Sequence, residues 1–275
     1  MNIEDEIKLV NISNKKELLK YYSGISELFE ESFNVSLNKD LWDWAYINNP
    51  FGEPLVSIAI ADDKVVGHYA VVPMNLESES SDLLGFLSMT TMVAVDYRRH
   101  KLFQRLAESV YDRIEKLSLP AIVFGFPNDN SAPGFIKRLG WKVSEEYKVI
   151  SLKPQQFDSV ASFLTNDLCG EFYTLNLEND AVKNWRTSKP NQEWDYSNGY
   201  GLKKIESGFD LMHISGADSF KRSKVSTPVN MLLRVTDELA IPDIEVSFPY
   251  RFGYRLFNLD SEPKLFVQMS MSDIF

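Results

Sequence analysis

Met92-Val-Ala-Val-Asp-Tyr-Arg-Arg-His-Lys-Leu-Phe103 is the stretch of sequence that decides the fold. It ends the apolar run 84–95, which predicts a strand, and leads into apolar residues at helical spacing over 102–117. A helix that begins directly after a strand gathers unpaired backbone N–H groups and the positive end of its dipole. Two arginines and a lysine add charge there, so the segment predicts an anion site, although a solvated basic turn would contain the same residues.

The regions on both sides of this segment predict a mixed sheet with helices on its faces. Upstream, apolar spacing predicts helices over 18–33 and 41–47, and two β-branched runs predict an antiparallel hairpin. Downstream we expect a buried strand, a short helix that ends at Gly140, and a further strand. The strand ranges are 55–61 and 65–72 for the hairpin, then 121–126 and 141–152. The fold class is therefore α/β (α+β).

The second half of the chain resembles the first. Trp185 is followed by Pro190 much as Trp44 is followed by Pro50, and a predicted hairpin comes after each tryptophan. We interpret this as a degenerate internal repeat, with domains over 1–155 and 156–275. The linking segment is poor in glycine, so the halves should pack together. The predicted strands of the second half are 200–205, 210–214, 230–235, 244–248 and 265–269.

Composition excludes several classes of protein. The 275 residues include 29 Lys and Arg against 39 Asp and Glu, a formal charge of −10, which disfavours a nucleic-acid partner. Cys169 is the only cysteine and there are three histidines, so neither a disulfide nor a metal site is expected. The acidic start does not have the order of a signal peptide, and no apolar stretch is long enough for a membrane helix. We therefore expect a cytoplasmic protein without a membrane partner.

The segment 58–141 resembles the GNAT superfamily of acyl-coenzyme A-dependent N-acyltransferases. The matching pieces are Asp62-Asp-Lys-Val-Val-Gly67, Met92-Val-Ala-Val95, Tyr97-Arg-Arg-His-Lys-Leu-Phe103, Asn128-Asp-Asn-Ser131 and Phe135-Ile-Lys-Arg-Leu-Gly-Trp141. The resemblance implies coenzyme A as co-substrate. It also implies that the backbone of Val93 and Val95 contacts pantetheine, and that the turn cradles the pyrophosphate. The implied turn residues are Arg98, Arg99, His100, Lys101, Leu102 and Phe103.

The sequence departs from the family pattern at functional positions. Lys101 and Phe103 stand where the family has small residues, usually glycine, and Ile136 replaces the tyrosine that often protonates the departing thiolate. Since glycine permits close backbone approach, these side chains must point away from the phosphates, or Lys101 must contact one directly.

A closer resemblance is to tandem-GNAT bacterial enzymes that acylate nucleotide-linked amino sugars for surface polysaccharide such as lipopolysaccharide O-antigen. It rests on Gly125-Phe-Pro-Asn-Asp-Asn-Ser131, Leu139-Gly-Trp141, the segment 44–50 and the degenerate second half. The implied donor is acetyl- or 3-hydroxybutanoyl-CoA, and the implied acceptor is a dTDP- or UDP-linked amino sugar. Two alternatives are an inactive binding module on the same scaffold and an aminoacyl transferase of cell-wall synthesis. A monomer and a homodimer both fit the sequence.

The chemistry of acyl transfer suggests further site residues. Backbone amides near Met92 and Val93 would stabilise the oxyanion, and His68 is the candidate base, with an interior histidine as the alternative. Asn128, Asn130 and Ser131 would either bond the pantetheine arm or cap the next helix. Thr90 is the strand candidate for the acceptor side. In the second half, Trp194, Tyr250, Arg251 and Tyr254 would bind base and diphosphate, or pack as ordinary aromatic and rim residues.

Overall fold

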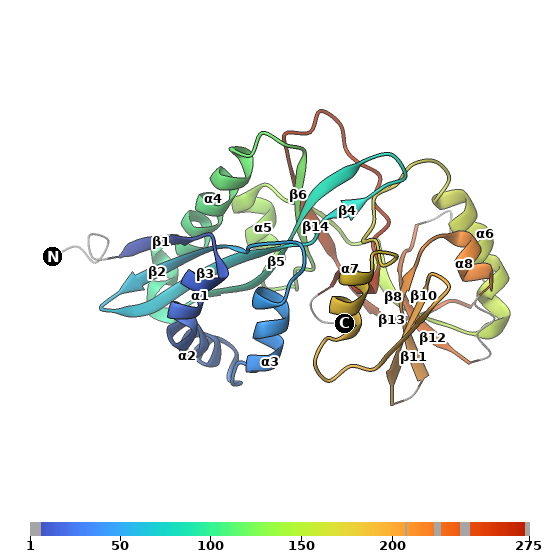
Figure 1. The fold of residues 1–275 in the computed structure, drawn as a ribbon, viewed down its shortest axis with the longest axis horizontal. Coiled ribbons are helices and arrows are strands. Elements are labelled where there is room, and N and C mark those ends of the chain that lie inside the picture. The colour runs from blue at the N-terminus through green and yellow to red at the C-terminus, as the bar shows by residue number, and fades with distance from the viewer. Residues whose placement is uncertain (1–6, 207, 223–226, 237–242, 273–275) are drawn as a thin grey trace.

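The computed structural model describes residues 7–206, 208–222, 227–236 and 243–272. The chain forms two lobes that lie side by side, each built on one β-sheet with helices against it (Figure 1). The sheets are mixed and mostly antiparallel, so the predicted fold class is confirmed.

The first part of the chain supplies most of the first lobe. Its elements are β1 (Lys8–Ile12), α1 (Lys15–Leu18), η2 (Leu19–Tyr21), α2 (Tyr22–Phe33), α3 (Lys39–Trp42), η3 (Asp43–Ile47), β2 (Leu55–Ala61), β3 (Lys64–Pro73), β4 (Leu76–Glu77), β5 (Asp82–Val93), η4 (Val95–His100), α4 (Leu102–Glu115), β6 (Ala121–Gly125), α5 (Ala132–Leu139) and β7 (Lys142–Ser144). Helices α4 and α5 cover one face of the sheet, and α1, α2 and α3 lie toward the other (Figure 1).

The rest of the chain forms most of the second lobe. Its elements are β8 (Tyr147–Leu152), η5 (Pro154–Gln156), α6 (Phe157–Asp167), α7 (Asp180–Thr187), β9 (Trp194–Ser197), β10 (Tyr200–Ile205), β11 (Gly208–Ile214), α8 (Ala217–Arg222), β12 (Val229–Arg234), β13 (Glu245–Pro249), β14 (Phe252–Phe257) and η6 (Met269–Met271). Helices α6 and α8 pack on the outer side of this lobe, and α7 lies near the first lobe (Figure 1).

Local sequence signals set the boundaries of several elements. The β2–β3 hairpin turns at Asp62 and Asp63, whose φ angles of 47° and 59° give the two left-handed residues of a type I′ turn. Helix α5 ends at Gly140, whose φ of 66° is the predicted left-handed cap. The structure confirms the predicted hairpin, the long strand before the basic turn and the helix cap at Gly140. It also confirms helical structure over the predicted ranges 18–33 and 41–47.

Some strand predictions were wrong. Residues 141–152 form two strands in different sheets, because the exposed pair Glu145-Glu146 separates β7 from β8. Residues 265–269 are not a strand, and their only described bridge joins Leu265 to Tyr173. The edge strand β1 and the short strand β9 were not predicted.

The two sheets share one strand order. Apart from β1 and β4, the first sheet runs β2-β3-β5-β6-β14-β7, and the second runs β9-β10-β11-β12-β8-β13. In both, the third and fourth strands are parallel and the other neighbours are antiparallel. The third strand also has a register shift in both sheets, near Thr90 in β5 and near Met212 in β11.

This match supports the internal repeat and corrects one of its correspondences. The hairpin equivalent to β2–β3 is β9–β10, which also has a two-residue left-handed turn, at Asn198 and Gly199. Strands β10 and β11, which the sequence paired with β2 and β3, correspond to β3 and β5 instead.

Each sheet also contains one strand from the other part of the chain. Strand β14 pairs with β6 and β7 in the first sheet, whereas β8 pairs with β12 and β13 in the second. Each of these strands therefore pairs with strands from the other side of the boundary expected between 155 and 156. The division into two domains stays a prediction.

Trp44 and Trp185 join the lobes through a nearly symmetric contact. Their rings stack with centroids 4.9 Å apart and planes within 10°. The Trp44 Nε1–H donates to the Trp185 carbonyl at 2.7 Å, and the Trp185 Nε1–H donates to the Trp44 carbonyl at 2.8 Å. Such a reciprocal contact is what a local twofold relation between two repeats produces.

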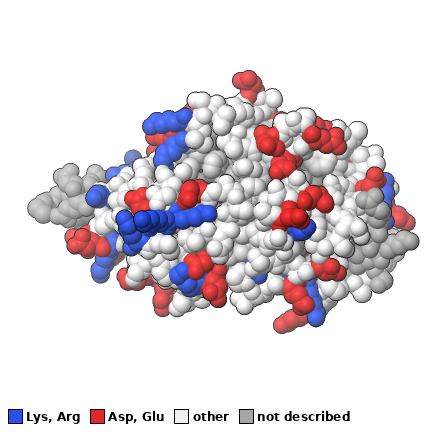
Figure 2. All heavy atoms as spheres, viewed as in Figure 1, with Lys and Arg blue, Asp and Glu red and all other residues white. Residues whose placement is uncertain are grey.

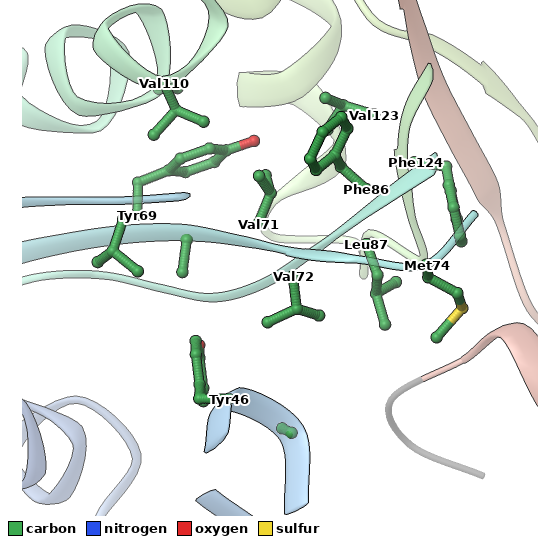
Figure 3. Packing of buried hydrophobic residues seen from close by; sticks show 14 of the residues in the cluster. Tyr46, Tyr69, Val71, Val72, Met74, Phe86, Leu87, Val110, Val123 and Phe124 are labelled. Carbon is green, nitrogen blue, oxygen red and sulfur yellow. The ribbon is translucent and has the colours of Figure 1, made fainter. Parts of the chain in front are cut away.

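The core of the first lobe extends over both faces of its sheet. Along β3, Tyr69 and Val71 point toward α4, whereas Val72 points toward Tyr46 of η3 (Figure 3). All four side chains are almost completely buried. Because both faces are packed, β3 and its neighbour β5 are held firmly up to the point where β5 leaves β6.

Candidate functional site

The site begins where two parallel strands separate. Strands β5 and β6 pair from Leu84–Ala121 to Leu87–Phe124, but β5 continues to Val93 without that partner. The separation opens a cleft at the carboxyl ends of both strands, directly before the basic turn η4. The predicted functional strand and turn therefore border one cavity.

The cleft has an inner and an outer part. The inner part, of about 290 Å³, is lined by Phe33, Ser88, Met89, Thr90, Thr91, Gly125, Phe126, Pro127, Asn128, Ser131, Phe135 and Trp141. The outer part, of about 690 Å³, is lined by Ser32, Phe33, Thr91, Met92, Val93, Arg98, Phe103, Asn130, Ser131, Pro133, Gly134, Phe135, Lys137 and Arg138. The two parts share residues and form one path from the basic turn inward to the end of the β5–β6 pairing.

A bulge in β5 faces this path. Thr90 has a left-handed φ of 54°, and two β5 residues, Thr90 and Thr91, oppose Tyr69 of β3. The Nδ1 atom of His68 lies 2.6 Å from the Thr90 carbonyl oxygen, so the neutral ring donates to it. This hydrogen bond from β3 therefore stabilises the bulge on the side away from the cleft.

His68 does not reach the cleft. Its side chain is fully buried, and burial lowers its pKa to about 4. Its Nε2 atom has no hydrogen-bond partner among the described residues. These surroundings favour an interior histidine over a catalytic base.

Strand alternation determines which backbone groups face the cleft. The Ala94 N–H donates to Val66 of β3, so the Met92 backbone two residues earlier is also directed toward β3. The backbone of Val93 points the other way, and its carbonyl accepts from Arg98 Nε at 3.3 Å. The oxyanion contact expected near Met92 and Val93 therefore fits Val93, and also Thr91, which the sequence analysis did not single out.

The turn after β5 has a left-handed residue where the resembled family has its first glycine. Lys101 has a left-handed φ of 56° at the position of the first family glycine. Helix α4 begins at the next residue, Leu102, whose side chain is fully buried. Arg98 lines the outer cleft, whereas Val95, Arg99 and His100 do not.

Phe103 lies where the family has a second small residue. Its ring packs edge-on against Phe135 with centroids 5.3 Å apart, beside Gly134 of α5. A Cβ atom on Gly134 would come within 3.2 Å of this ring. The aromatic ring is therefore accommodated by a glycine in the facing helix, and it forms part of the outer cleft wall.

Positive charge near the outer cleft is local. Lys137 and Arg138 of α5 line it together with Arg98. Elsewhere, acidic and basic side chains are scattered in small groups over the face shown in Figure 2, with no broad basic area among its described residues. This distribution fits a small anionic ligand better than a nucleic-acid strand.

The loop before α5 forms the opposite rim. The Asn128 Oδ1 atom accepts from the backbone N–H groups of Asn130 and Ser131, at 3.1 and 3.0 Å. The Ser131 hydroxyl donates to the Asn128 carbonyl at 3.3 Å. Asn128 is thus occupied in shaping the start of α5, while Asn130 and Ser131 line the outer cleft.

The predicted acceptor residues are only partly brought together. Thr90 lines the inner cleft, and Tyr250 stacks on Phe126 of its wall with centroids 4.8 Å apart. Arg251 is ion-paired with Asp129 and Glu145 beside the rim. The other two lie elsewhere: Trp194 contacts Arg186 of α7, and Tyr254 lines a separate pocket between the lobes.

Several lining residues were not predicted as site residues. Phe33, Ser88 and Thr91 were not among the predicted site residues, and Lys137 and Trp141 appeared only within the motif that carries the family resemblance. Strand parity with Thr90 could have indicated Ser88, because residues two apart share a face. Nothing local could have indicated Phe33, since it reaches the cleft from the end of α2.

The equivalent opening in the second lobe is occupied by protein. Strands β11 and β12 pair only up to Leu211–Met231. Beyond that point the Ile214 N–H donates to the Gln268 side chain at 2.7 Å, and Gln268 donates to Thr174. The helix that follows, α8, has Asp218 in its first turn, so this half lacks the basic turn of the first.

Comparisons with known proteins agree with this geometry. Residues 18–144 match the family model described as an acetyltransferase (GNAT) domain. No curated protein matches the sequence at a significant level. The fold is similar to a GCN5-related N-acetyltransferase from Kribbella flavida, with TM-score 0.60 and 12% identity over 92% of this chain and 72% of that chain.

Two further structures show the same architecture. A GCN5-related N-acetyltransferase from Anabaena variabilis has TM-score 0.57 and 11% identity, over 90% of this chain and 72% of that chain. Eis1 from Mycobacterium abscessus has TM-score 0.56 and 9% identity, over 91% of this chain and 73% of that chain. At these identities the likeness concerns the fold, and it includes both lobes.

Two further findings concern the described residues. No group of three or more His, Cys, Asp or Glu side chains in that part of the chain is placed to hold a metal ion. Its helices are all too short or too polar to cross a bilayer. Residues 18–144 thus match a GNAT acetyltransferase domain, and this match supports an acyl-CoA-dependent N-acyltransferase.

Proposed function

We propose that this enzyme transfers an acyl group, acetyl or 3-hydroxybutanoyl, from acyl-CoA to the amino group of a dTDP- or UDP-linked amino sugar. The transfer would be direct, within a ternary complex. The observation that carries the donor side is the separation of β5 from β6 immediately before the basic turn. The sequence resemblance and the second lobe beside the cleft support the acceptor class.

The donor would lie along the path from the outer to the inner cleft. The pyrophosphate would bind near Arg98 and the start of α4, where backbone N–H groups and the helix dipole favour negative charge. The pantetheine arm would follow the free edge of β5 at Val93 and Thr91. Because the pairing closes at Leu87, the acyl group would point toward the inner cleft.

The chain would promote transfer chiefly by orienting the donor and stabilising charge. An amide on the free edge of β5 would donate to the thioester oxygen as the amine attacks, where the oxyanion develops. Neither part of the cleft has Asp, Glu or His among its described lining residues. The amine would therefore arrive neutral, and its nitrogen would bond to the thioester carbon as the C–S bond breaks. The proton that the nitrogen loses would pass to water, and water would protonate the departing coenzyme A thiolate.

His68 would act as a positioning residue through the Thr90 bulge. His68→Asn retains a donor that can reach the Thr90 carbonyl, whereas His68→Ala does not. We expect the asparagine variant to keep most of the turnover and the alanine variant to lose it, with similar donor affinities for both. An equal loss of turnover in both variants would restore the base role.

The acceptor would enter from the side of the second lobe. Tyr250 lies close to the inner wall and Arg251 close to the rim. To bind a phosphate of the acceptor, Arg251 would have to give up an ion pair with Asp129 or Glu145. Trp194 and Tyr254 stay predictions, because neither side chain lines the cleft. The predicted contacts of Arg99, His100 and Asn128 with coenzyme A likewise stay predictions.

The experiment is a thiol-release assay with acetyl-CoA and 3-hydroxybutanoyl-CoA, each with dTDP- and UDP-linked amino sugars. We expect release only when donor and acceptor are both present, and weaker donor binding in Arg98→Ala by calorimetry. The matched control is Arg234→Ala, which removes an exposed arginine of the second lobe. The proposal fails if coenzyme A does not bind, and release that requires aminoacyl-tRNA would favour the cell-wall alternative.

A further inference from the structure

The inner and outer parts of the cleft meet at four side chains, which we call the neck. The neck consists of the residues that line both parts, Phe33, Thr91, Ser131 and Phe135. Thr91 belongs to β5 and Ser131 directly precedes α5, whereas the two phenylalanines come from α2 and α5. The neck therefore offers two hydroxyl groups between two apolar rings.

The leaving group of acyl transfer needs hydrogen-bond donors in this cleft. When the amine nitrogen bonds to the thioester carbon, the C–S bond breaks and its electron pair passes to sulfur. A charged sulfur that is partly removed from water is costly unless donors reach it. Ile136, which stands in place of the family tyrosine, is exposed and lines neither part of the cleft. The donors must therefore come from other side chains.

The proposed path of the donor brings its sulfur to the neck. Val93 lines only the outer part and Ser88 only the inner part, so Thr91 marks the crossing between them. The oxyanion contact lies on this stretch of β5, and the acyl group points into the inner part. Because sulfur is bonded directly to the thioester carbon, it lies beside Thr91 as well.

Strand parity directs the Thr91 side chain toward the helices that cover this end of the sheet. Val93 lies opposite Gly67, and a Cβ atom on Gly67 would come within 2.9 Å of Leu106 of α4. Val93 therefore faces α4, and Thr91, two residues earlier, shares that face. Helix α5 covers the same face of the sheet (Figure 1). The Thr91 hydroxyl makes no hydrogen bond with any other described residue.

The Ser131 hydroxyl is available for a similar reason. Ser131 is the N-cap residue of α5, but its side chain makes no capping hydrogen bond. Its hydroxyl donates to the Asn128 carbonyl at 3.3 Å, and the same carbonyl accepts from the backbone N–H groups of Ser131 and Ala132 at 3.1 and 2.9 Å. A carbonyl oxygen has two lone pairs, so the hydroxyl is a third and longer donor that can rotate away. The positive end of the α5 dipole also favours an anion here.

We propose that the Thr91 and Ser131 hydroxyls donate hydrogen bonds to the coenzyme A sulfur and stabilise the thiolate as the C–S bond breaks. This inference rests on the proposed function, because it takes the donor to be an acyl-CoA that lies along β5. Both hydroxyls keep their hydrogens, and the proton that converts the thiolate into the free thiol comes from water. Thr91 and Ser131 are catalytic residues in this sense, and neither is a general acid.

The first measurement is the pKa of the coenzyme A thiol in its complex with the protein, followed by the ultraviolet absorbance of the thiolate. Thr91→Val and Ser131→Ala should each raise this pKa by about one unit relative to the wild-type complex, as loss of one hydrogen bond to a charged group allows. Thr91→Ser and Ser131→Thr keep a hydroxyl and should stay close to the wild-type value.

A second pair of measurements separates the thiolate from donor binding in general. The acetyl-CoA affinities of Thr91→Val and Ser131→Ala should stay within about twofold of wild type by calorimetry, because a thioester sulfur carries no charge. Turnover in the thiol-release assay should fall about tenfold in each, with the donor KM unchanged.

Thr165→Val and Ser162→Ala are the matched controls. Each of these hydroxyls donates to a backbone carbonyl within α6, outside the cleft, and neither substitution should change the thiol pKa, the affinity or the turnover. Thermal melting of every variant checks that it is folded.

The outcomes distinguish this inference from the proposed function. An unchanged thiol pKa in both Thr91→Val and Ser131→Ala would overturn the inference alone, since coenzyme A would still bind. A shift in Thr91→Ser as large as that in Thr91→Val would do the same, because the hydroxyl would not be its cause. Failure of coenzyme A to bind the wild-type protein would overturn the proposed function, and this inference with it.

Discussion

At the scale of single residues, two buried histidines make the stability of the protein depend on pH. Burial lowers the pKa of His68 to about 4 and that of His213 to about 3. In the unfolded chain both would titrate near 6.5. Between these values the unfolded chain binds protons that the folded protein does not, so their contribution is complete above about pH 6.5 and is lost as pH falls.

We therefore expect the free energy of unfolding to fall by about 1.4 kcal/mol per pH unit for each histidine as the pH drops from 6.5 toward 4. Urea denaturation at several pH values measures this slope. His68→Asn and His213→Asn should each reduce it, and their effects should add. A slope unchanged in both variants would show that neither histidine is buried in its neutral form.

Lys101 is a second residue with a measurable effect, because it adopts a left-handed conformation without being glycine. Its φ is 56° and its side chain is exposed. Lys101→Gly should raise the free energy of unfolding by about 1 kcal/mol, since the left-handed region disfavours residues with a Cβ atom. Arg99→Gly, in the preceding turn with ordinary φ, is the control and should lower it. Chemical denaturation of both variants decides the matter, and destabilisation by Lys101→Gly would contradict the expectation.

At the scale of elements, helices α4 and α5 meet where Phe103 packs beside Gly134. Gly134→Ala improves helix propensity by about 0.5–1 kcal/mol, but it places a Cβ atom 3.2 Å from the Phe103 ring. The substitution should therefore give little or no stabilisation in the natural protein. In the Phe103→Ala background the contact is absent, and the full stabilisation should appear.

A double-mutant cycle on these two positions measures their coupling directly. We expect an interaction energy of about 1 kcal/mol from denaturation of the two single variants and the double variant. Additive effects would mean that the ring moves aside freely. The same cycle bears on the cleft, because both residues line its outer part.

At the scale of the whole molecule, the exchange of β8 and β14 links the folding of the two lobes. A fragment of residues 1–155 lacks β14, so β6 and β7 lose the strand that lies between them. It retains β8, whose partners β12 and β13 are absent. We expect this fragment alone to show no cooperative unfolding transition, because its sheet edge and its core are incomplete.

Adding the fragment 156–275 should restore the native circular dichroism spectrum and a single transition. Circular dichroism and thermal melting of each fragment, and of their mixture, provide the measurement. The intact chain is the reference. A cooperative native-like melt of the fragment 1–155 would show that the first lobe folds independently, as the predicted domain division implies.

Local patterns predicted much of the first lobe correctly. The two-residue turn at Asp62-Asp63 and the cap at Gly140 depend on backbone preferences of a few neighbouring residues. The strand before the basic turn was likewise readable from its own composition. By contrast, the irregular segment 265–269 has the apolar content of a strand but finds no continuous partner edge.

Those parts of the candidate site that consist of short continuous segments were predictable. The turn over 98–103 and the loop over 128–131 were identified, and both border the cleft. The oxyanion roles of Met92 and Val93 stay predictions, and strand alternation favours Val93. Phe33 and Trp141 were missed because they reach the cleft only through packing of distant elements.

The sequence by itself determined the order of elements in the first lobe, the basic turn after β5 and the repetition of the Trp44 pattern at Trp185, since each depends on nearby residues or on direct repetition. Only the tertiary structure decided which strand fills each sheet, that Gln268 occupies the second opening, and that Phe33 and Trp141 line one cleft. Those features depend on pairing between segments far apart in the chain, and local conformational preference carries no information about which distant edge a strand will meet.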